Sequence, residues 1–521
     1  MLVVNQIKCS LEQTNQLKQR IALKLKAPLE DILHYEILKE SIDARKEVII
    51  VYSCLVNIKH EQRYLSKQDV SLYHPEVFSI PNALKETSPI VIGFGPSGMF
   101  AALTLAQSGL KPIIFERGSR VEKRLEDVEK LWKDGIINPE SNVQFGEGGA
   151  GTFSDGKLTT RSKDLRIHHI FEMFIEHGAK EEIRYKQHPH IGTDCLVDIV
   201  RNIRNHIIEL GGTFYFDTKV ESLLIEKETC IGICANGKNY YSNYVVLAIG
   251  HSAYDTLKSI YTDQVYMEAK DFAVGVRVEH PQQMIDKNQY KQYFKHPLLK
   301  ASEYRLTYQA SNERGVYSFC MCPGGYVVAS NSNHGEIVTN GMSKSKRDHV
   351  YANSAILVQV KKEDYYKSSV LDGIDYLKKI EQQAYLLGGS NYYAPCCNIK
   401  DFVYDTNTPL IFKPTYLPGV KQIDMHTLFS TSILLSLKES MLHFDKKIPG
   451  FIEQGVMIAP ETRSSSVVRI LRNEQLQSLN TKQLYPCGEG AGYAGGITSS
   501  ALDGLKVAIA IIEDINKGVK Q

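Results

Sequence analysis

Long apolar runs, strong charge and repeats are all missing from this sequence. No stretch approaches the roughly 18 consecutive apolar residues that indicate a transmembrane helix, so we expect none. The first residues, MLVVNQIKCSLEQTNQ, lack the basic start, apolar stretch and cleavage site of a signal peptide. The formal net charge is only +2, too small to favour nucleic acid or an anionic membrane as partner. These absences predict a soluble, cytoplasmic protein with no membrane contact.

Several catalytic motifs that spacing alone can reveal are also absent. HExxH, Walker A and GxSxG do not occur, which argues against zinc proteases, P-loop enzymes and α/β-hydrolases. No histidine pair is accompanied by a set of metal ligands, so no metal is predicted. The ten cysteines form no repeating framework, and we interpret them as reduced thiols.

Residues 1–85 are interpreted as a small α+β module. Its basic residues are more typical of a solvated helix face than of an RNA-binding surface. The predicted elements are a strand at 2–9, a helix through 17–25, a second helix at 31–40 and a strand at 48–58. A polar run with Pro75 and Pro81 predicts a connection to the rest of the chain.

The pattern GxGxxG occurs three times, and context separates the matches. They are Gly93-Gly95-Gly98, Gly146-Gly148-Gly151 and Gly490-Gly492-Gly495. Only the first follows an apolar strand, opens a helix and meets an acidic residue, Glu116, about twenty positions later. The second match lacks the strand and helix, and the third has no following strand. The first match therefore predicts a dinucleotide-binding turn.

Each residue of this turn has a physical task. Gly93 permits the tight turn, Gly95 lets the backbone approach a diphosphate, and Gly98 lets the helix pack on the strand. Pro96 and Ser97 begin the helix, whose unpaired N–H groups and dipole favour a diphosphate. Glu116 is expected to accept hydrogen bonds from the ribose, and the adjacent Arg117 is included in the predicted cofactor site.

These motifs, together with others along the chain, resemble the bacterial flavoproteins known as FAD-dependent dehydrogenases, within the FAD/NAD(P)-binding oxidoreductases. The segments that carry the resemblance are VIGFGPSGMFAAL, QFGEGGAGTFSDGKLTTR, VVLAIGHSAYDT, FAVGVRVEHP, RGVYSFCMCPGG, PETRSSSVVRI and YPCGEGAGYAGGITSSALDG. The resemblance implies FAD as the cofactor and an oxidoreductase or dehydrogenase activity. It also implies an α/β fold whose FAD-binding domain is Rossmann-like, of the glutathione reductase type.

The same resemblance assigns further cofactor residues. Ala248 and Gly250 lie in a strand-to-glycine motif near the cofactor, and Val220 lies where main chain meets the adenine. Gly488 and Glu489 fall where an acidic residue, often aspartate, holds the ribityl chain; here glutamate replaces it.

Two further segments are predicted to face the flavin ring. Gly495 and Gly496 precede a helix beginning near Ile497, whose positive end would stabilise reduced, anionic flavin. In FGEGGAGTFSDGKL, the glycines are expected to leave one flavin face free, and a side chain to hydrogen-bond the ring. The glycines are Gly148, Gly149 and Gly151, and the side chain is that of Ser154 or Lys157. The alternative is a glycine-rich surface loop.

Candidate catalytic residues are fewer. Arg463 in PETRSSSVVRI is a candidate clamp for a carboxylate and Glu461 a candidate acid or base, although a salt bridge between them is equally consistent. His251 is a third candidate.

The redox partners of the flavin are less defined. There is no second dinucleotide unit, so NAD(P)H is expected only as a transient donor. The CxxC of disulfide reductases is missing. Electron exchange with a flavin is one interpretation of the pairs Cys320 with Cys322 and Cys396 with Cys397, but buried structural thiols are favoured.

The resulting hypothesis has four segments. These are the module 1–85, an FAD-binding domain formed by 86–270 and 455–521, and an inserted α+β substrate or cap domain at 271–454. We predict hydride transfer between flavin N5 and a small organic substrate or transient NAD(P)H. The alternatives are a flavoprotein acting on a macromolecule such as tRNA, with 1–85 as docking module, and FAD as a purely structural element.

Overall fold

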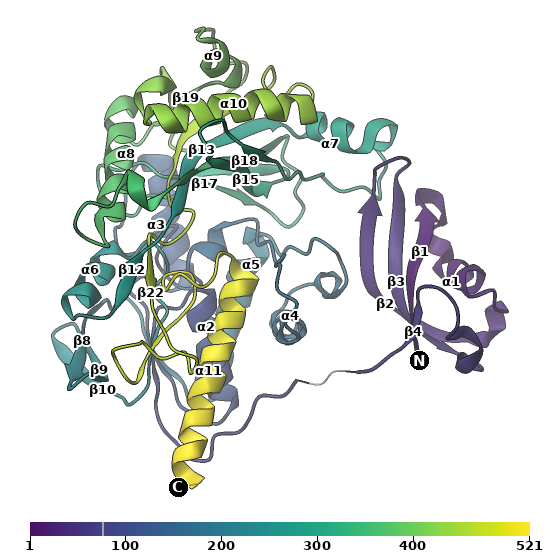
Figure 1. The fold of residues 1–521 in the computed structure, drawn as a ribbon, viewed down its shortest axis with the longest axis horizontal. Helices are drawn as coiled ribbons and strands as arrows, with labels where there is room; N and C mark the ends of the chain where they lie inside the picture. Colours follow the sequence, from purple (N-terminus) through teal and green to yellow (C-terminus); the bar gives the residue numbers. More distant parts are fainter. Residues whose placement is uncertain (76–77, 521) are drawn as a thin grey trace.

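The computed structural model describes residues 1–75 and 78–520, and it contains three parts (Figure 1). A small N-terminal module stands to one side, and the remaining chain forms a domain on a parallel sheet and a domain on a larger, mostly antiparallel sheet. The connection predicted after the module includes residues 76–77, and the last predicted segment ends at 521; those positions lie outside the described residues. No helix in the described part of the chain has the length and apolarity needed to cross a membrane.

The N-terminal module is a four-stranded antiparallel sheet of order β2-β3-β1-β4, with one helix against it. Its elements are β1 (Leu2–Ser10), α1 (Leu17–Leu25), β2 (Ile32–Asp43), β3 (Ile49–Ile58) and β4 (Val70–Leu72). The helix predicted at 31–40 is wrong, because this segment is β2 and pairs with β3 along its whole length. Pairing with an apolar neighbouring strand decides the structure here over local helix propensity.

Two backbone hydrogen bonds and an apolar contact attach the N-terminal module to the rest of the molecule. The backbone N–H of Glu40 donates to the Tyr185 carbonyl oxygen at 2.8 Å, and the Gln187 N–H donates to the Glu40 carbonyl at 2.9 Å. The core of the module also includes Tyr290, from a helix of another domain. The edge of β2 is therefore partly occupied within the chain.

The second part, here called the parallel-sheet domain, carries the predicted dinucleotide turn. Its strands follow the order β23-β11-β5-β6-β7 and all pair in parallel. They are β5 (Ile90–Ile92), β6 (Ile113–Phe115), β7 (Thr213–Tyr215), β11 (Val245–Leu247) and β23 (Leu484–Pro486). Helices α2 (Pro96–Gln107) and α11 (Ile497–Lys520) pack side by side (Figure 1). The strand–helix–strand unit β5-α2-β6 confirms the Rossmann-like fold class.

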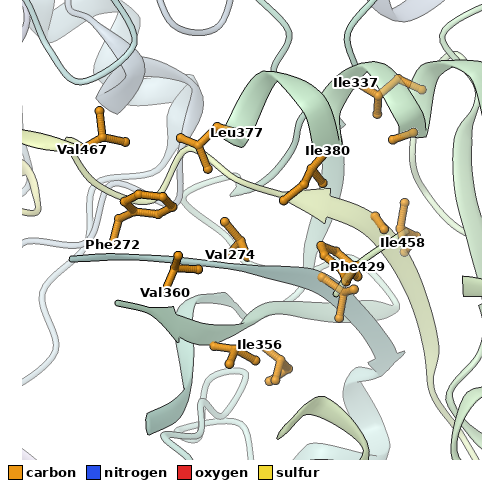
Figure 2. Close-up of a cluster of buried hydrophobic side chains, with 14 of the residues drawn as sticks. Phe272, Val274, Ile337, Ile356, Val360, Leu377, Ile380, Phe429, Ile458 and Val467 are labelled. Carbon is orange, nitrogen blue, oxygen red and sulfur yellow. The ribbon is translucent and has the colours of Figure 1, made fainter. Parts of the chain in front are cut away.

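The third part, the cap domain, is built on a seven-stranded sheet of order β14-β15-β18-β13-β21-β19-β20. Its strands are β13 (Phe272–Pro281), β14 (Thr307–Gln309), β15 (Gly315–Cys322), β18 (Tyr351–Val360), β19 (Ala394–Asn398), β20 (Val420–Gln422) and β21 (Val456–Glu461). Helices α8 (Asp372–Gly388) and α10 (Thr431–Lys447) belong to the same domain. Figure 2 shows its apolar core, where Phe272 and Val274 of β13 face Leu377 and Ile380 of α8.

The predicted boundary between 454 and 455 is wrong. Strand β21 begins at Val456 and lies between β13 and β19 in the sheet of the cap domain. The chain returns toward the parallel-sheet domain only after Glu461, where β22 (Val468–Ile470) pairs with β12 (Met267–Ala269). The apolar sequence VMIAPE suits a strand in either domain, so local composition could not locate the boundary.

The remaining elements complete the two larger domains. The helices are α3 (Val121–Asp134), α4 (Arg166–Glu176), α5 (Thr193–Glu209), α6 (Tyr254–Thr262), α7 (Gln282–Tyr290) and α9 (Ile399–Tyr404). The strands are β8 (Val220–Glu226), β9 (Thr229–Ala235), β10 (Lys238–Tyr241), β16 (Gly325–Ala329) and β17 (Thr339–Ser343).

Candidate functional site

A cavity of about 1080 Å³ lies between the parallel-sheet domain and the cap domain. We call it the interdomain cavity. Its volume is slightly above the roughly 300–1,000 Å³ typical of ligand sites. One wall contains the dinucleotide turn before α2 and the start of α11, and the facing wall contains residues of β15 and β17. The site therefore combines a predicted nucleotide-binding element with a wall from a second domain.

Most predicted cofactor residues line this cavity. They are Gly93, Gly95, Pro96, Ser97, Glu116, Arg117, Gly149, Gly151, Ser154, Lys157, Val220, Ala248, Gly250, Glu489, Gly495, Gly496 and Ile497. The candidates Glu461, Arg463 and His251 line it as well. Gly98, Gly148 and Gly488 are not among the lining residues and act through packing, as described below.

The first glycine turn is shaped by close backbone contacts. A Cβ atom on Gly93 would lie 2.5 Å from the Ala248 carbonyl oxygen, and one on Gly98 only 1.9 Å from the Gly93 carbonyl oxygen. The latter contact joins strand β5 to helix α2 without a side chain between them. Gly95, in contrast, faces the cavity at the start of α2. This division matches the expected tasks of the three glycines.

Glu116 connects two of the glycine turns. Its carboxylate accepts hydrogen bonds from the backbone N–H groups of Phe94 at 2.8 Å, Gly118 at 2.9 Å and Gly146 at 3.0 Å. The side chain is buried but lines the cavity. An ionised carboxylate offers about four acceptor positions, so one remains for a ligand hydroxyl. Besides the predicted contact to ribose, Glu116 thus positions the second glycine turn.

The loop Gly146–Gly151 lies against the first turn. A Cβ on Gly149 would be 2.8 Å from the Cα of Gly95, and one on Gly151 would be 3.2 Å from Ile497. The expectation for Gly148 needs correction, because a Cβ there would meet Thr152 Oγ1 at 2.2 Å and the glycine does not line the cavity. Gly148 is required for packing inside the loop, whereas Gly149 and Gly151 form part of the cavity wall.

Arg124 holds this loop from behind. The side chain is fully buried and donates to four carbonyl oxygens. The acceptors are Asn142 at 2.8 Å, Val143 at 3.0 Å, Gly146 at 3.3 Å and Glu147 at 2.7 Å. Burial lowers the pKa of Arg124 to about 10, so the guanidinium stays charged at neutral pH. Arg124 was not among the residues predicted from the sequence, although its spacing places it on the buried face of α3 with Val128 and Leu131.

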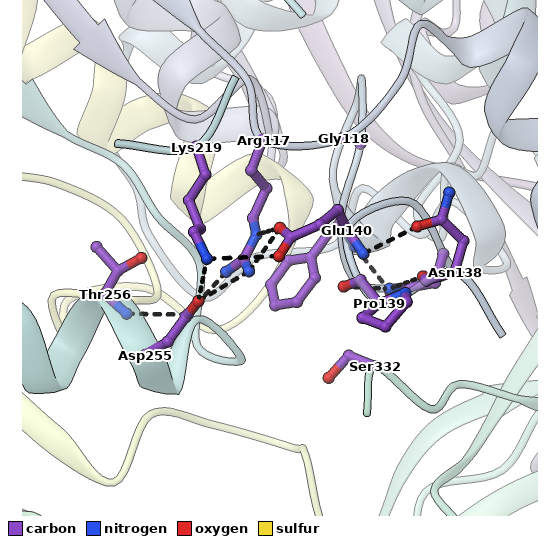
Figure 3. A network of polar contacts seen from close by, with 12 residues as sticks. Arg117, Gly118, Asn138, Pro139, Glu140, Lys219, Asp255, Thr256 and Ser332 are labelled. Carbon is purple, nitrogen blue, oxygen red and sulfur yellow. Dashed lines mark hydrogen bonds and ion pairs between the residues drawn. The ribbon is translucent and has the colours of Figure 1, made fainter. Parts of the chain in front are cut away.

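Arg117 is fixed by a charged network (Figure 3). It pairs with Glu140 at 2.7 Å and Asp255 at 2.9 Å, and its guanidinium lies 4.0 Å from the centre of the Phe145 ring. Lys219 approaches the same two carboxylates. Burial tends to raise the pKa of Asp255, but its bond to Arg117 lowers it to about 2. The network braces the cavity wall next to Glu116.

The third glycine turn brings the start of α11 to the cavity. The Gly488 N–H donates to the Asp503 carboxylate at 2.7 Å, and a Cβ on Gly488 would lie 2.4 Å from Ser97 Oγ. Gly488 is thus a packing residue between the turn and α2, which corrects its expected contact with the cofactor. Gly495, Gly496 and Ile497 line the cavity at the N-terminus of α11.

His251 and Glu489 lie together in the cavity wall. His251 Nδ1 is 3.5 Å from Glu489 Oε2, and the imidazole is only 8% exposed. Its Nε2 is buried without a hydrogen-bond partner among the described residues. A buried, unpaired ring nitrogen at a cavity is satisfied when a ligand supplies the partner. This atom is one sign that the site is built for a bound polar group.

Glu461 and Arg463 do not pair with each other. Glu461 accepts from the buried Arg277 at 2.8 and 2.6 Å. Arg463 donates to Glu381 at 2.7 Å and to Glu336 at 2.9 Å. The alternative of a mutual salt bridge is therefore wrong. Both residues line the cavity, but the Arg463 side chain is fully buried. Each charge is already neutralised by an acidic or basic partner that is distant in sequence.

Ser154 and Lys157 also have partners within the protein. Ser154 Oγ donates to the Gly151 carbonyl at 2.6 Å, and Lys157 pairs with Glu303 at 2.8 Å. On the cap side, sequence reasoning did not identify the wall formed by Tyr304, Tyr317 and Phe319. The alternation of residues in β15 can indicate which side chains share one side of the strand, but it cannot indicate that this side lines a cavity.

Comparison with known proteins gives a close relative. An uncharacterized protein of Clostridium beijerinckii is 48% identical over 523 residues, which cover 98% of each chain. A family model described as "FAD-dependent protein, C-terminal domain-like" matches residues 271–464, and a domain of unknown function matches residues 1–59. The first match extends three residues beyond β21, in agreement with the corrected domain boundary.

Solved structures show more distant likeness. Glycerol-3-phosphate dehydrogenase from Bacillus halodurans, complexed with FAD, is 12% identical, with a TM-score of 0.35 over 84% of this chain and 66% of that one. A myxobacterial chondrochloren halogenase is 11% identical, with a TM-score of 0.39 over 84% and 76%. Glycine oxidase from Bacillus cereus is 11% identical, with a TM-score of 0.31 over 82% and 97%. These scores are too low to carry an argument about function.

Proposed function

The chain belongs to a family of FAD-dependent proteins that includes its Clostridium beijerinckii relative, and we propose that it is an oxidoreductase acting on a small organic molecule. Its cofactor is FAD. The observation that carries the proposal is the interdomain cavity, whose one wall holds the dinucleotide turn while the other belongs to the cap domain.

The residues present fit FAD. The glycine turn leaves the N-terminus of α2 open to the cavity at Gly95 and Ser97, where backbone N–H groups suit a diphosphate. Glu116 keeps one acceptor position for the adenosine ribose, beside the start of β8 at Val220. Glu489 and the unpaired Nε2 of His251 offer polar contacts further along the cavity. Three glycine turns therefore meet around one elongated site.

When bound, FAD supplies two-electron redox chemistry, in which hydride passes between a substrate carbon and flavin N5. The chain's own contribution is to bind, orient and shield. The N-terminus of α11 favours negative charge near it by about 0.3–2 kcal/mol. The cap wall of Tyr304, Tyr317 and Phe319 excludes water from the opposite side of the cavity and offers aromatic surface to a substrate.

A small substrate is favoured over a macromolecule for a structural reason. None of the described residues of the N-terminal module, 1–75 and 78–85, lines the interdomain cavity. The edge of β2 that a nucleic acid or peptide would need is partly paired with the segment Tyr185–Gln187. We further propose that NAD(P)H, if it is the donor, enters the same cavity transiently. An RNA-binding signal that weakens with salt and needs residues 1–85 would reverse this preference.

Anaerobic stopped-flow spectroscopy tests the proposal. The FAD-loaded protein is mixed with NADH, NADPH and a panel of small organic metabolites, and bleaching of the flavin absorbance is followed. We expect at least one compound to bleach the flavin with a saturable rate. Bound flavin that no compound reduces, and that air does not reoxidise after chemical reduction, would favour a structural role for FAD instead.

A further inference from the structure

Two cysteines of β15 face the interdomain cavity. Among the ten cysteines, Cys320 and Cys322 line it, whereas the adjacent pair Cys396 and Cys397 is buried in the cap-domain core. The structure thus separates two cysteine pairs that the sequence could not rank. Cys320 is accessible from the cavity, and Cys322 lies beneath it with 1% of its surface exposed.

The backbone at this point departs from a regular strand. The pairing of β15 with β18 shifts register between Phe319 and Cys322, and Cys320 has a φ of +41°, which L residues rarely adopt. The Cys322 thiol turns back toward Cys320 and donates to its carbonyl oxygen, with an Sγ–O distance of 3.2 Å. Such bulges re-aim side chains and occur often beside active sites. Here the bulge brings one thiol close to the backbone of the other.

A buried positive charge supports the pair. Arg277 is fully buried and donates to the Cys320 carbonyl oxygen at 3.1 Å. It is held by Glu461 and by Asn353, whose side-chain oxygen lies 2.8 Å away. The task of Glu461 is therefore to fix Arg277 beside the thiols. The Arg277 guanidinium lowers the energy of a thiolate during disulfide exchange, and the charge of Glu461 offsets part of this effect.

We propose that Cys320 and Cys322 form a dithiol–disulfide pair that exchanges two electrons with the FAD of this protein. In the forward direction two S–H bonds are lost and one S–S bond forms. The two electrons and one proton reduce FAD to its anionic two-electron form, and the second proton passes to solvent. This inference rests on the proposed function, since it requires the flavin to occupy the same cavity.

Burial shapes how fast the exchange runs. Although Cys320 is accessible from the cavity, the enclosing protein removes both thiols from bulk water. This raises the pKa of Cys320 to about 12 and that of Cys322 to about 11, so both thiols are protonated at neutral pH. The charged groups that act on the pair are Arg277, Glu461, Asp155, Lys157 and Arg347. Because the thiolate is the reactive form, the exchange rate is expected to rise about tenfold per pH unit in the neutral range.

Reductive titration tests the pair without a known substrate. The FAD-loaded protein is oxidised with ferricyanide, desalted and titrated anaerobically with dithionite while flavin absorbance is recorded. We expect about four electrons per FAD, two for the flavin and two for a disulfide. Alkylation of the oxidised, denatured protein should then label all but two of its ten cysteines, with Cys320 and Cys322 unlabelled.

Matched variants decide the assignment. C320S and C322S should each take up about two electrons per FAD. Cys234 is half-buried and lies outside the cavity, so C234S should take up about four electrons per FAD, like the wild type. Uptake of two electrons by the wild type with all cysteines alkylated would overturn the inference. FAD content is measured separately from the absorbance spectrum, so a failure to bind FAD is distinguished from an inactive thiol pair.

Discussion

Replacement of Gly149 by alanine tests whether the second glycine turn supports the first. Gly149 has a φ of +62° and a ψ of −166°, a backbone conformation that is used almost only by glycine, so alanine there costs about 1–3 kcal/mol. Its Cβ would also lie 2.8 Å from Gly95 Cα, whereas ordinary contacts begin at 3.4 Å. Gly95 must therefore retreat by about 0.6 Å (3.4 − 2.8), since backbone cannot rotate away as a side chain can.

The retreat of Gly95 weakens FAD binding in a calculable way. A shift of this size lengthens a hydrogen bond of about 2.9 Å between the turn at Gly95 and the FAD diphosphate, and takes it out of the normal range. Loss of one bond to a charged group costs about 1.5–3 kcal/mol, which corresponds to a rise in the Kd for FAD of about 10- to 150-fold. Fluorescence titration of the FAD-free variant with FAD measures this Kd.

Gly237 supplies the matched control. It has nearly the same φ, +66°, in the hairpin between β9 and β10, and a Cβ there would meet nothing within 4 Å. G237A therefore places a side chain at a positive φ without a close contact, and it should bind FAD like the wild type. If G149A and G237A bind FAD equally well, the contact between the two glycine turns does not support the cofactor site.

Three further predictions concern buried charges. Arg124→Met leaves the carbonyl oxygens of the glycine loop unpaired. Thermal unfolding should show that the free energy of unfolding falls by about 3–5 kcal/mol, and the purified variant should contain less FAD. Burial raises the pKa of Glu147 to about 7. The protonated Glu147 side chain therefore stabilises the fold below about pH 4.5, and this contribution of about 3 kcal/mol is lost as the pH rises through 7. The free energy of unfolding of E147Q, measured in urea, should therefore depend less on pH than that of the wild type. Arg463→Met leaves Glu381 and Glu336 buried without their cation and should lower the free energy of unfolding by about 3–5 kcal/mol in urea titrations. The corresponding argument would be contradicted by a wild-type free energy of unfolding for Arg124→Met or Arg463→Met, or by a wild-type pH profile for E147Q.

The dinucleotide turn was the part of the site most accessible from sequence, for a physical reason. Gly93, Gly95, Gly98 and Glu116 lie within one strand–helix–strand unit, so their spacing is set by local geometry. The contact of the loop at Gly149 with this unit depends instead on tertiary packing. No spacing rule links the loop to the turn it covers.

The ion pairs of the cavity wall show the same limit more clearly. Glu461 and Arg463 are two positions apart in sequence, and a salt bridge between them was one of the two alternatives that local reasoning left open. Their partners are Arg277 and Glu381, which come from β13 and α8 and are brought in by the seven-stranded sheet. Likewise β2 was interpreted as a helix, because the pairing strand β3 that decides its structure is not visible in its own residues.

Equilibrium titration of the FAD-free protein with FAD tests the central claim most directly. The account predicts saturable binding of one FAD per chain, with quenching of flavin fluorescence and an absorbance band near that of oxidised flavin. NAD⁺ at the same concentrations should not compete. If correctly folded protein binds no FAD, or if NAD⁺ displaces it, the three glycine turns do not form the site described here.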